Sequence, residues 1–598
     1  MNQTYVRIEQ PKRKLLDLEL IPTPLVADKE RKPIKILPLD DFNRPNGLMV
    51  IWRFLLFGLH ILGLRLRGVQ DNMSLAKDAR ELFQGLGGLW IKLGQLLSLR
   101  TDYFSDEMCS ELSHLLFANN GFPGADARLI IERELGCPLD QIFSEFDENP
   151  IAAASIAQVH RAVLRKENIP VVIKLLRPNV VQDFRRDMSL LRSIVNVLEF
   201  LMPVGHLRLH DGLNELDALL EEELNYAIEA SNSRILRKSL LRHDVYVPYV
   251  FRNYCTEKML VMEEISGVLM GDAITVKNTD PERFQAWCKE NGVDPKKVAT
   301  QLFLSNMRQI MEDNLFHGDM HPGNIILLRN NRYALIDFGT IGTLDTNYLH
   351  IHLGMLKALS ERQYDKAANL CLHLCSEFPT SDIDIIRMEL VKVLKLWQAR
   401  SEFKSLSYHD RSINGSTKLI GRVFTQFRLQ VNWTALRMGR TWGTLDASLA
   451  TFHPNMNHTR LFNRYLKEAE NRQEKNKLKL LRKNLIDLVE TTKQYQVLLE
   501  PVLQRTTISY KQKLNKFNLV MAAIMRYVSI ATIIGIIFVI NAFIDQHYFD
   551  MDSSFMGRLV DDFPLLDREW FLILLIGLTL PIFLLRRLIK IVSSSYLR

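Results

Sequence analysis

Cysteine is scarce in this chain of 598 residues, which contains six. So few thiols argue against a disulfide framework and favour a reducing compartment. Cys371, His373 and Cys375 stand close together, but on a helix His373 would face away from the two thiols. A zinc site is therefore not expected there. Hydrophobic and charged contents of 47% and 24% are near those of globular proteins, which excludes wholesale disorder.

Neither sign of charge dominates, since 76 basic and 68 acidic residues give a net charge of +8. No basic stripe is present beyond two short clusters near the C-terminal end, so a nucleic acid partner is not expected. A targeting leader is not indicated either. The apolar run Leu48–Leu64 begins too far from Met1 for a signal peptide, and Arg53 and His60 interrupt it. This run is more typical of a helix lying at a membrane surface than of one crossing it.

Two long apolar runs lie near the C-terminal end: Tyr527–Ile544, and Trp570–Leu585 continued by Leu588–Val592. Roughly 20 apolar residues span a bilayer, so both runs are candidate transmembrane helices, although buried core helices are an alternative. Basic residues flank the outer ends of the pair, and the loop between them is acidic. By the positive-inside rule, the pair predicts a hairpin anchor with most of the chain on the cytoplasmic side.

The apolar spacing predicts a helical region over about 76–142, with Asp126 capping a helix that ends at Gly136. Alternating and β-branched runs predict strands, and the remainder to about residue 499 is mostly helical. The expected strands are Ala157–Leu164, Val171–Leu175, Tyr246–Val250, Lys258–Met262, Ile325–Leu328 and Tyr333–Ile336. A small sheet region followed by a helical mass predicts an α+β, bilobal, protein-kinase-like fold.

Glycine is missing where a protein kinase would have its Gly-rich loop over the ATP phosphates: the residues there are Ala152, Ala153, Ala154 and Ser155. After this loop, the run Val171-Val172-Ile173 leads to Lys174, the natural partner of the α- and β-phosphates. An alanine-rich helix with a solvated lysine is the simpler alternative. The next motif decides between these interpretations.

The run "HGDMHPGNIILLRNNRYALIDFGTIG", residues 317–342, has the kinase order of catalytic residues. Asp319 can orient a nucleophile or accept its proton. Asn324 and Asp337 supply hard oxygen ligands for Mg²⁺ bridging the phosphates of ATP. Each of these residues alone is weak evidence, but the three in this order predict a site that binds the phosphates of a nucleotide.

These motifs resemble the UbiB family of atypical kinases, most closely over residues 76–344. That family has an alanine-rich loop and a Lys-x-Gly-Gln motif on an N-terminal helical extension, here Lys92, Gly94 and Gln95. The resemblance implies that this extension covers the active site and that Lys92 contacts an acidic Glu-x-Asp motif.

The acidic motif departs from the family, because it reads Glu223-Leu224-Asn225 in this chain. By the same resemblance Glu229 would pair with Lys174. The expected nucleotide contacts are Ala152–Ser155, Lys174 and Glu263, and the expected cofactors are ATP and Mg²⁺.

The organisation expected from these features has seven parts: a polar segment 1–46, an interfacial helix 47–75, a helical extension 76–149, an N-lobe 150–265, a helical C-lobe 266–500, a basic juxtamembrane helix 501–526 and a transmembrane hairpin 527–598.

By resemblance, the chain is expected to be a membrane-anchored, Mg²⁺-dependent ATPase or atypical kinase that supports the biosynthesis of isoprenoid quinones or related membrane lipids. A membrane lipid or quinone-like molecule, the bilayer and other quinone-biosynthesis enzymes are the expected partners. A bacterial inner membrane is the favoured location, ahead of an organellar membrane. Two alternatives stay open: a small-molecule kinase of the aminoglycoside or choline kinase type, and a nucleotide-binding pseudokinase scaffold.

Overall fold

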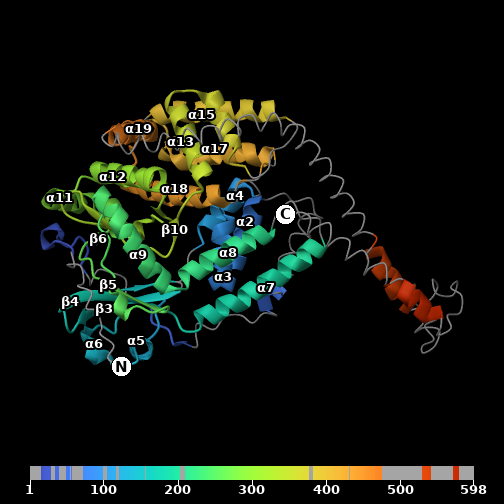
Figure 1. Cartoon of the computed structure of the whole chain (residues 1–598), viewed down its shortest axis with the longest axis horizontal. Coiled ribbons are helices and arrows are strands. Elements are labelled where there is room, and N and C mark those ends of the chain that lie inside the picture. Colours follow the sequence, from blue (N-terminus) through green and yellow to red (C-terminus); the bar gives the residue numbers. More distant parts are fainter. Residues whose placement is uncertain are drawn as a thin grey trace, which may run out of the picture. The chain divides into compact units, whose positions relative to one another are not determined.

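Most of the helices and strands of this computed structural model fall between residues 72 and 474 (Figure 1). Two units are distinguished, and the one formed by Met1–Arg192 and His210–Leu480 contains the candidate site. The structure describes residues 15–27, 34–39, 49–50, 52–53, 56, 72–98, 104–115, 120–154, 156–201, 209–375, 382–403, 405–427, 429, 431, 433–474, 528, 530–540, 570–577 and 579.

The helical extension predicted from the leucine spacing is present as five helices. They are α2 (Asn72–Leu86), α3 (Gly88–Leu97), α4 (Asp106–Ser113), α5 (Gly124–Leu135) and α6 (Leu139–Ile142). Gly136 ends α5 in the left-handed region at φ 70°, where glycine carries no steric penalty. The prediction that Asp126 caps α5 is wrong: Pro123 occupies the cap position and Asp126 lies in the first turn.

An antiparallel sheet forms the smaller lobe. Its strands are β1 (Phe143–Phe146), β2 (Ala152–Ala153), β3 (Ala157–Leu164), β4 (Ile169–Leu176) and β5 (Met259–Glu263). The order is β1-β3-β4-β5, with β2 paired to β3, and Lys174 of β4 stands opposite Val159 of β3. One face of the sheet packs with Ala127 and Ile131 of α5 in a separate apolar core.

The predicted strand Tyr246–Val250 is wrong, because only isolated bridges form at its two ends, to Ala334 and to Met262. Pro248 lies in its middle and has no N–H to donate to a ladder, which accounts for the interruption. The long helical region before it consists of three helices: α7 (Val180–Leu201), α8 (Leu209–Glu223) and α9 (Tyr226–Leu240).

Helices dominate the larger lobe. They are α10 (Met270–Thr279), α11 (Pro281–Asn291), α12 (Pro295–Arg308), α13 (Thr346–Ser360), α14 (Tyr364–Leu372), α15 (Ile383–Glu402), α16 (Tyr408–Arg411), α17 (Ile413–Gln426), α18 (Trp433–Phe452) and α19 (His458–Glu474). Two small sheets lie among them, β6 (Val268–Leu269) with β8 (Ile325–Leu327) and β9 (Tyr333–Leu335), and β7 (Phe316–His317) with β10 (Ile341–Gly342).

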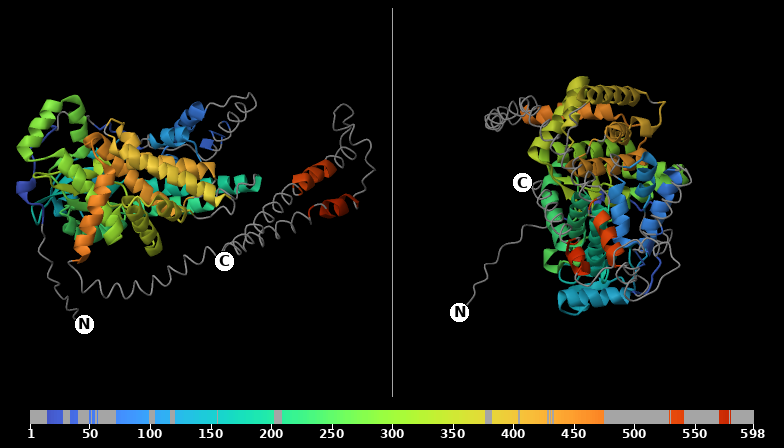
Figure 2. Two further views of the ribbon diagram at one scale, coloured as in Figure 1. Left: turned by 90° about the horizontal axis from the view of Figure 1, so that it is seen from above. Right: turned by 90° about the vertical axis from the view of Figure 1, so that its right-hand side faces the viewer.

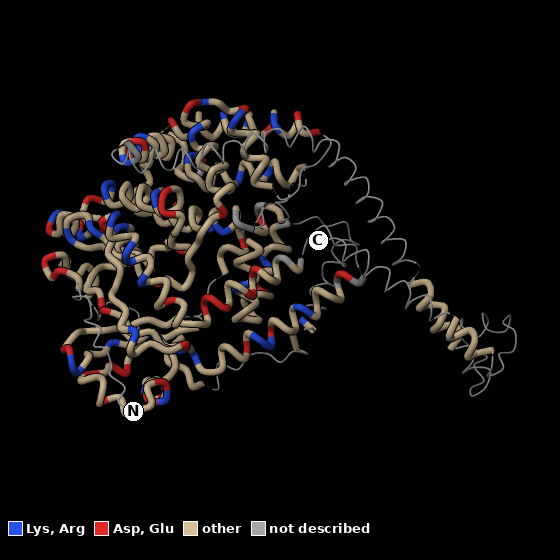
Figure 3. Tube along the Cα trace, in the orientation of Figure 1, with Lys and Arg blue, Asp and Glu red and all other residues tan. Residues whose placement is uncertain are grey.

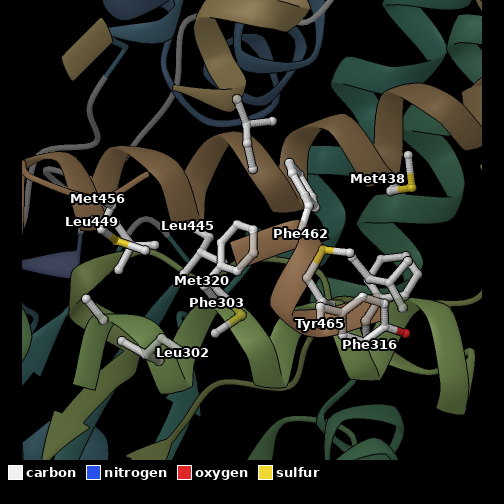
Figure 4. Packing of buried hydrophobic residues seen from close by; sticks show 14 of the residues in the cluster. Leu302, Phe303, Phe316, Met320, Met438, Leu445, Leu449, Met456, Phe462 and Tyr465 are labelled. Carbon is white, nitrogen blue, oxygen red and sulfur yellow. The ribbon is translucent and has the colours of Figure 1, made fainter. Parts of the chain in front are cut away.

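One large apolar core holds this lobe together. Figure 4 shows Phe303 of α12, Leu445 of α18 and Phe462 of α19 packed in the space between their helices, with Met320 beside them. The sheet β3–β5 lies at one side and α13, α15 and α17 at the other, in both Figure 1 and the right-hand view of Figure 2. The predicted α+β arrangement of two lobes is therefore confirmed.

The predicted membrane segments are described only in part. Residues 528, 530–540, 570–577 and 579 are helical, and the rest of the two apolar runs and the juxtamembrane segment lie outside the described residues. Within the described stretches, no helix has both the length and the apolarity that a membrane span requires. Of the predicted interfacial helix 47–75, residues 49, 50, 52, 53, 56 and 72–75 are described. All are helical, and 72–75 belong to α2.

Candidate active site

Lys174 is the centre of a charge cluster between the sheet and α9, in which Lys174 and Glu229 are largely buried and the side chain of Asp337 is 44% exposed. Its Nζ lies 2.9 Å from Oε2 of Glu229 and 3.2 Å from Oδ2 of Asp337, and it sits 5.2 Å from the centre of the Tyr226 ring. Glu229 is only 2% exposed. The β-branched run of β4 buries the backbone below Lys174, so the side chain extends toward α9. Two carboxylates and an aromatic face thus fix one ammonium group.

The charges in this cluster support one another. Burial opposes the charge on Lys174, but Asp337 and Glu229 outweigh it and hold the pKa of Lys174 well above its usual value. Burial likewise opposes the charge on Asp337, yet the nearby Lys174 and His317 lower the pKa of Asp337 to about 2. For Glu229 burial wins over Lys174, and its pKa is raised. Lys174 and Asp337 are therefore both charged at neutral pH.

Asp319 lies in the loop after β7, where two groups hold it. Its backbone N–H donates to Nδ1 of His317 at 3.0 Å, while Nε2 of His317 donates to the carbonyl of Ile336 at 3.1 Å. The Asp319 carboxylate also meets the guanidinium of Arg440 in α18 at 3.2 Å. His317 thus fastens the Asp319 loop to the strand that leads into Asp337.

Asp337 has a backbone conformation that few residues adopt, with φ at 63°. Aspartate tolerates this region because its short side chain can bond locally, and here Oδ1 accepts from the N–H of Gly339 at 3.3 Å. Nearby, Nδ2 of Asn324 donates to the carbonyl of Asp319 at 3.0 Å. Because Nδ2 makes that bond, Oδ1 is the amide atom of Asn324 that could ligate a cation.

The alanine-rich loop runs along the edge of the sheet. Ala152 and Ala153 pair with β3 as the short strand β2, and Ala154 lines the cavity described below. The guanidinium of Arg177 donates to the carbonyl of Ala154, which ties the loop to the end of β4. Ser155 lies outside the described residues.

The Lys-x-Gly-Gln residues each have a distinct contact. Nζ of Lys92 lies 2.6 Å from Oε1 of Glu223 in α8, so α3 is bridged to α8. Nε2 of Gln95 donates to the carbonyl of Leu115 at 3.0 Å. A Cβ on Gly94 would stand 2.3 Å from a methyl carbon of Leu115, so any larger residue would require the buried Leu115 side chain to shift.

One cavity of about 1090 Å³ joins these groups. Its polar lining includes Lys92, Lys174, Asp319, Asp337 and Arg440, and its walls come from α3, α4, α8, α13, α17 and α18 as well as from the sheet. The extension therefore covers the charged cluster, since Lys92 and Gln95 of α3 and Cys109 of α4 belong to the same wall.

Residues 118–371 match the model of the ABC1 atypical kinase-like domain. The "Probable protein kinase UbiB" of Shewanella oneidensis is 36% identical over 341 residues, covering 56% of this chain and 59% of that protein. The relative with this name in Tolumonas auensis is 34% identical over 343 residues, covering 56% and 60%. Over the matched residues the chain is therefore similar to the UbiB proteins and to the atypical kinase-like domain. It spans about three fifths of the length of these curated relatives.

A solved structure, that of Rv3197 with erythromycin from Mycobacterium tuberculosis, is similar to this chain at 23% identity and a TM-score of 0.43. The likeness covers 61% of this chain and 89% of that one. At this score it carries no argument about the site.

Two residues of the chain have contacts other than those expected for them. Asn225 is the N-cap of α9, where its Oδ1 accepts from the N–H of Ala227 at 2.9 Å, and it does not line the described cavity. The Glu263 carboxylate accepts from the hydroxyl of Tyr246 at 2.7 Å and from the N–H of Leu16 at 2.7 Å. The Glu263 side chain is therefore engaged outside the cavity, and the nucleotide contact expected for Glu263 stays a prediction.

Sequence reasoning missed three residues that complete the site: His317, Tyr226 and Arg440. His317 had a signal, since it stands two residues before Asp319 in the motif. Tyr226 begins α9, three residues before Glu229. No sequence signal indicated Arg440, because it reaches Asp319 from a helix 121 residues further along the chain.

Proposed function

We propose that this chain is a Mg²⁺-dependent atypical kinase or ATPase that binds ATP in the cavity around Lys174. The observation that carries the proposal is the pairing of Lys174 with both Glu229 and Asp337 on the wall that Asp319 also lines. Catalysis of phosphoryl transfer consists mostly of positioning and charge stabilisation, and this cluster supplies fixed charges of both signs. The family match and the protein kinase names of the relatives support the same chemistry.

Mg²⁺ fits the residues present. It is commonly held by one or two carboxylates together with substrate phosphates, and here Asp337 and Asn324 would supply an anionic and a neutral oxygen. Among the described residues, no group of three or more His, Cys, Asp and Glu side chains could hold a metal by itself. Bound there, Mg²⁺ would neutralise charge on the phosphates. Lys174 would hold the phosphates, and Asp319, held by Arg440, would orient the attacking hydroxyl or water.

The acceptor that fits this cavity is a small, mostly apolar molecule. The α3–α4 extension forms part of the wall and is fastened by Lys92 to Glu223, so the loop of a folded protein would have to displace it. Most of the remaining lining is apolar, which suits a lipid-like or quinone-like molecule. We therefore propose a role in isoprenoid quinone or related lipid biosynthesis, where other enzymes of that route would be partners.

We also propose that 527–598 anchors the chain in a bacterial inner membrane with the kinase-like lobes in the cytoplasm. The supporting features are the two apolar runs and their basic flanks. In the kinase-like part, charges of both signs are interspersed (Figure 3), which favours no nucleic acid partner.

The test is ATP hydrolysis by the full chain reconstituted in vesicles, with and without anionic lipid and Mg²⁺. We expect hydrolysis that requires Mg²⁺, rises with lipid and falls at least about 100-fold in Asp319→Asn and Asp337→Asn. Asp365→Asn, which changes an exposed carboxylate on α14, is the matched control. Nucleotide binding without turnover under every condition would contradict the proposal and favour a scaffold.

A further inference from the structure

Two hydroxyl groups of α18 fasten the loop on either side of Asp319. Oγ1 of Thr441 lies 3.3 Å from the carbonyl oxygen of Gly318. Oγ of Ser448 lies 3.0 Å from the carbonyl oxygen of Met320. Each hydroxyl also reaches a carbonyl of its own helix, so its proton is shared between helix and loop. Both residues are fully buried, so α18 and the Asp319 loop keep one relative position.

Arg440 extends from the same part of α18 to the Asp319 carboxylate. Its Nη2 lies 3.2 Å from Oδ2 of Asp319, and this contact uses one N–H of the guanidinium. Among the described residues, the other N–H groups of Arg440 have no hydrogen-bond partner. The Arg440 side chain lines the cavity and is 24% exposed. A guanidinium with unused donors on a cavity wall is suited to bind an anion such as a phosphate.

There is space for such an anion beside Arg440. The preceding residue, Gly439, also lines the cavity, and nothing lies within 4 Å of a Cβ added to it. Lys174 and Asp337 line the same cavity. In phosphoryl transfer by kinases, the lysine holds the inner phosphates and the catalytic aspartate meets the nucleophile, so the transferred group lies between them. Arg440 approaches this place from the Asp319 side.

The cations Lys174 and Arg440 differ in how far their charge is compensated. Lys174 lies between two carboxylates, those of Glu229 and Asp337. Among the described residues, Arg440 is paired with Asp319 alone. A general base loses its negative charge when it accepts the proton of the nucleophile. If Asp319 does so, the charge of Arg440 becomes available during the reaction, whereas that of Lys174 stays compensated.

We propose that Arg440 is a catalytic residue that binds the phosphoryl group transferred from ATP, an assignment that rests on the proposed function. The oxygen of a water or hydroxyl forms a bond to the γ-phosphorus, while the bond from that phosphorus to the bridging oxygen breaks and its electron pair stays with ADP. The proton of the nucleophile passes to the Asp319 carboxylate and then to solvent. As Asp319 is neutralised, the Arg440 guanidinium turns its charge to the phosphoryl oxygens and stabilises the transition state.

The experiment uses the full chain in anionic vesicles with Mg²⁺ and combines ATP turnover with two isothermal titrations. One titrant is the non-hydrolysable analogue AMPPNP, and the other is ADP with aluminium fluoride, which mimics the transferred group. Arg440→Gln should lower turnover and weaken the fluoride complex at least about 100-fold each, because the contact forms in the transition state. AMPPNP affinity should change less than about threefold. Arg440→Lys keeps the charge without the planar fork and should recover part of both losses.

Arg437→Gln is the matched control. Arg437 lies one turn earlier on α18, where it pairs with Glu215 of α8, and it does not line the cavity. This variant also removes an ion-paired arginine from the helix. Turnover and both affinities should stay at the wild-type level.

A second pair of variants separates contact with the phosphoryl group from positioning of Asp319. If Arg440 touches the phosphoryl group, adding Arg440→Gln to Asp319→Asn should weaken the fluoride complex by about a further tenfold. No further loss in that double variant would mean that Arg440 only holds Asp319, and it would overturn the proposal. Wild-type turnover in Arg440→Gln would also overturn it while leaving the proposed function intact. Absence of turnover in the wild-type chain would overturn the proposed function and this inference together.

Discussion

Two parts of the cavity wall differ in whether their polar groups have partners. Lys174 pairs with Glu229 and Asp337, and Asp319 pairs with Arg440, so these charges are fixed in position. Around His352 of α13 the groups are neutral, and among the described residues three polar atoms of His352 and the two rings beside it have no partner. Paired charges rigidify a site before the ligand arrives, whereas unpaired neutral groups favour a ligand that satisfies them. The cavity is therefore suited to two kinds of chemistry.

The largest effect on activity is expected from removing the positive charge of Lys174. Lys174→Met removes the ammonium group that would hold the phosphates and leaves Glu229 and Asp337 without their cation. ATP turnover by the full chain should fall at least about 100-fold. Lys366→Met, at an exposed position on α14, should keep its turnover. Wild-type turnover in Lys174→Met would show that phosphate chemistry takes place elsewhere.

The second prediction concerns the neutral groups around His352. His352 has a pKa of about 4 in the folded chain and about 6.5 when unfolded. Between these pH values the unfolded chain binds a proton that the folded chain does not, so the free energy of unfolding rises as pH rises from 4 to 6.5. His352→Phe should remove this contribution, which is on the order of 3 kcal/mol. Melting temperatures across pH 4–7 measure it.

His350→Phe is the control for this measurement, because it changes a histidine two residues away on α13 that lies outside the cavity wall. It should keep the wild-type slope of melting temperature against pH. A wild-type slope in His352→Phe would instead mean that His352 is not buried as a neutral group.

The third prediction concerns the packing of α3 against the segment after α4, which together form part of the cavity wall near Lys174. Gly94→Ala would push a Cβ against Leu115 and force α3 away from the segment after α4. We expect a loss of roughly 1–3 kcal/mol in the free energy of unfolding, measured by urea denaturation. Gly439→Ala also changes a helical glycine, but nothing lies within 4 Å of its added Cβ. The Gly439 variant should be at least as stable as the wild type, and equal losses in the two variants would contradict the packing argument.

The smallest effect is expected at Asn225, the cap of the helix that carries Glu229. Asn225→Ala should cost about 1 kcal/mol of stability, because the N–H of Ala227 loses its acceptor. Asn225→Asp restores the family's residue and keeps an acceptor oxygen, so it should retain wild-type stability. Urea denaturation of the two variants separates these outcomes, and a loss in Asn225→Asp as large as that in Asn225→Ala would argue against capping as the role of this side chain.

Local sequence signals predicted much of the framework. Ala157–Leu164 was predicted as a strand with the bounds that β3 has, because alternation and β-branched residues act over a few positions. The order of Asp319, Asn324 and Asp337 likewise belongs to one short stretch of chain. The predicted strand Tyr246–Val250 was wrong, because the prediction gave more weight to the apolar residues than to Pro248.

Contacts between distant segments could not be predicted in this way. Arg440 reaches Asp319, and Trp442 reaches His352, only because α18 packs across the larger lobe. Nothing in the spacing of α13 indicates that Tyr348 and His352 face a cavity rather than solid core. The capping role of Asn225 was not predicted either, because the family motif suggested a contact with Lys92, whereas the local backbone needs a hydrogen-bond acceptor.

The most direct test of the central claim is calorimetric titration of the full chain with ATP, in Mg²⁺ and again in EDTA, for the wild type, Lys174→Met and Asp337→Asn. The account predicts that wild-type affinity falls at least about tenfold without Mg²⁺, that Asp337→Asn loses this dependence, and that Lys174→Met binds weakly in both conditions. Equal affinity in all three proteins, with or without Mg²⁺, would contradict it.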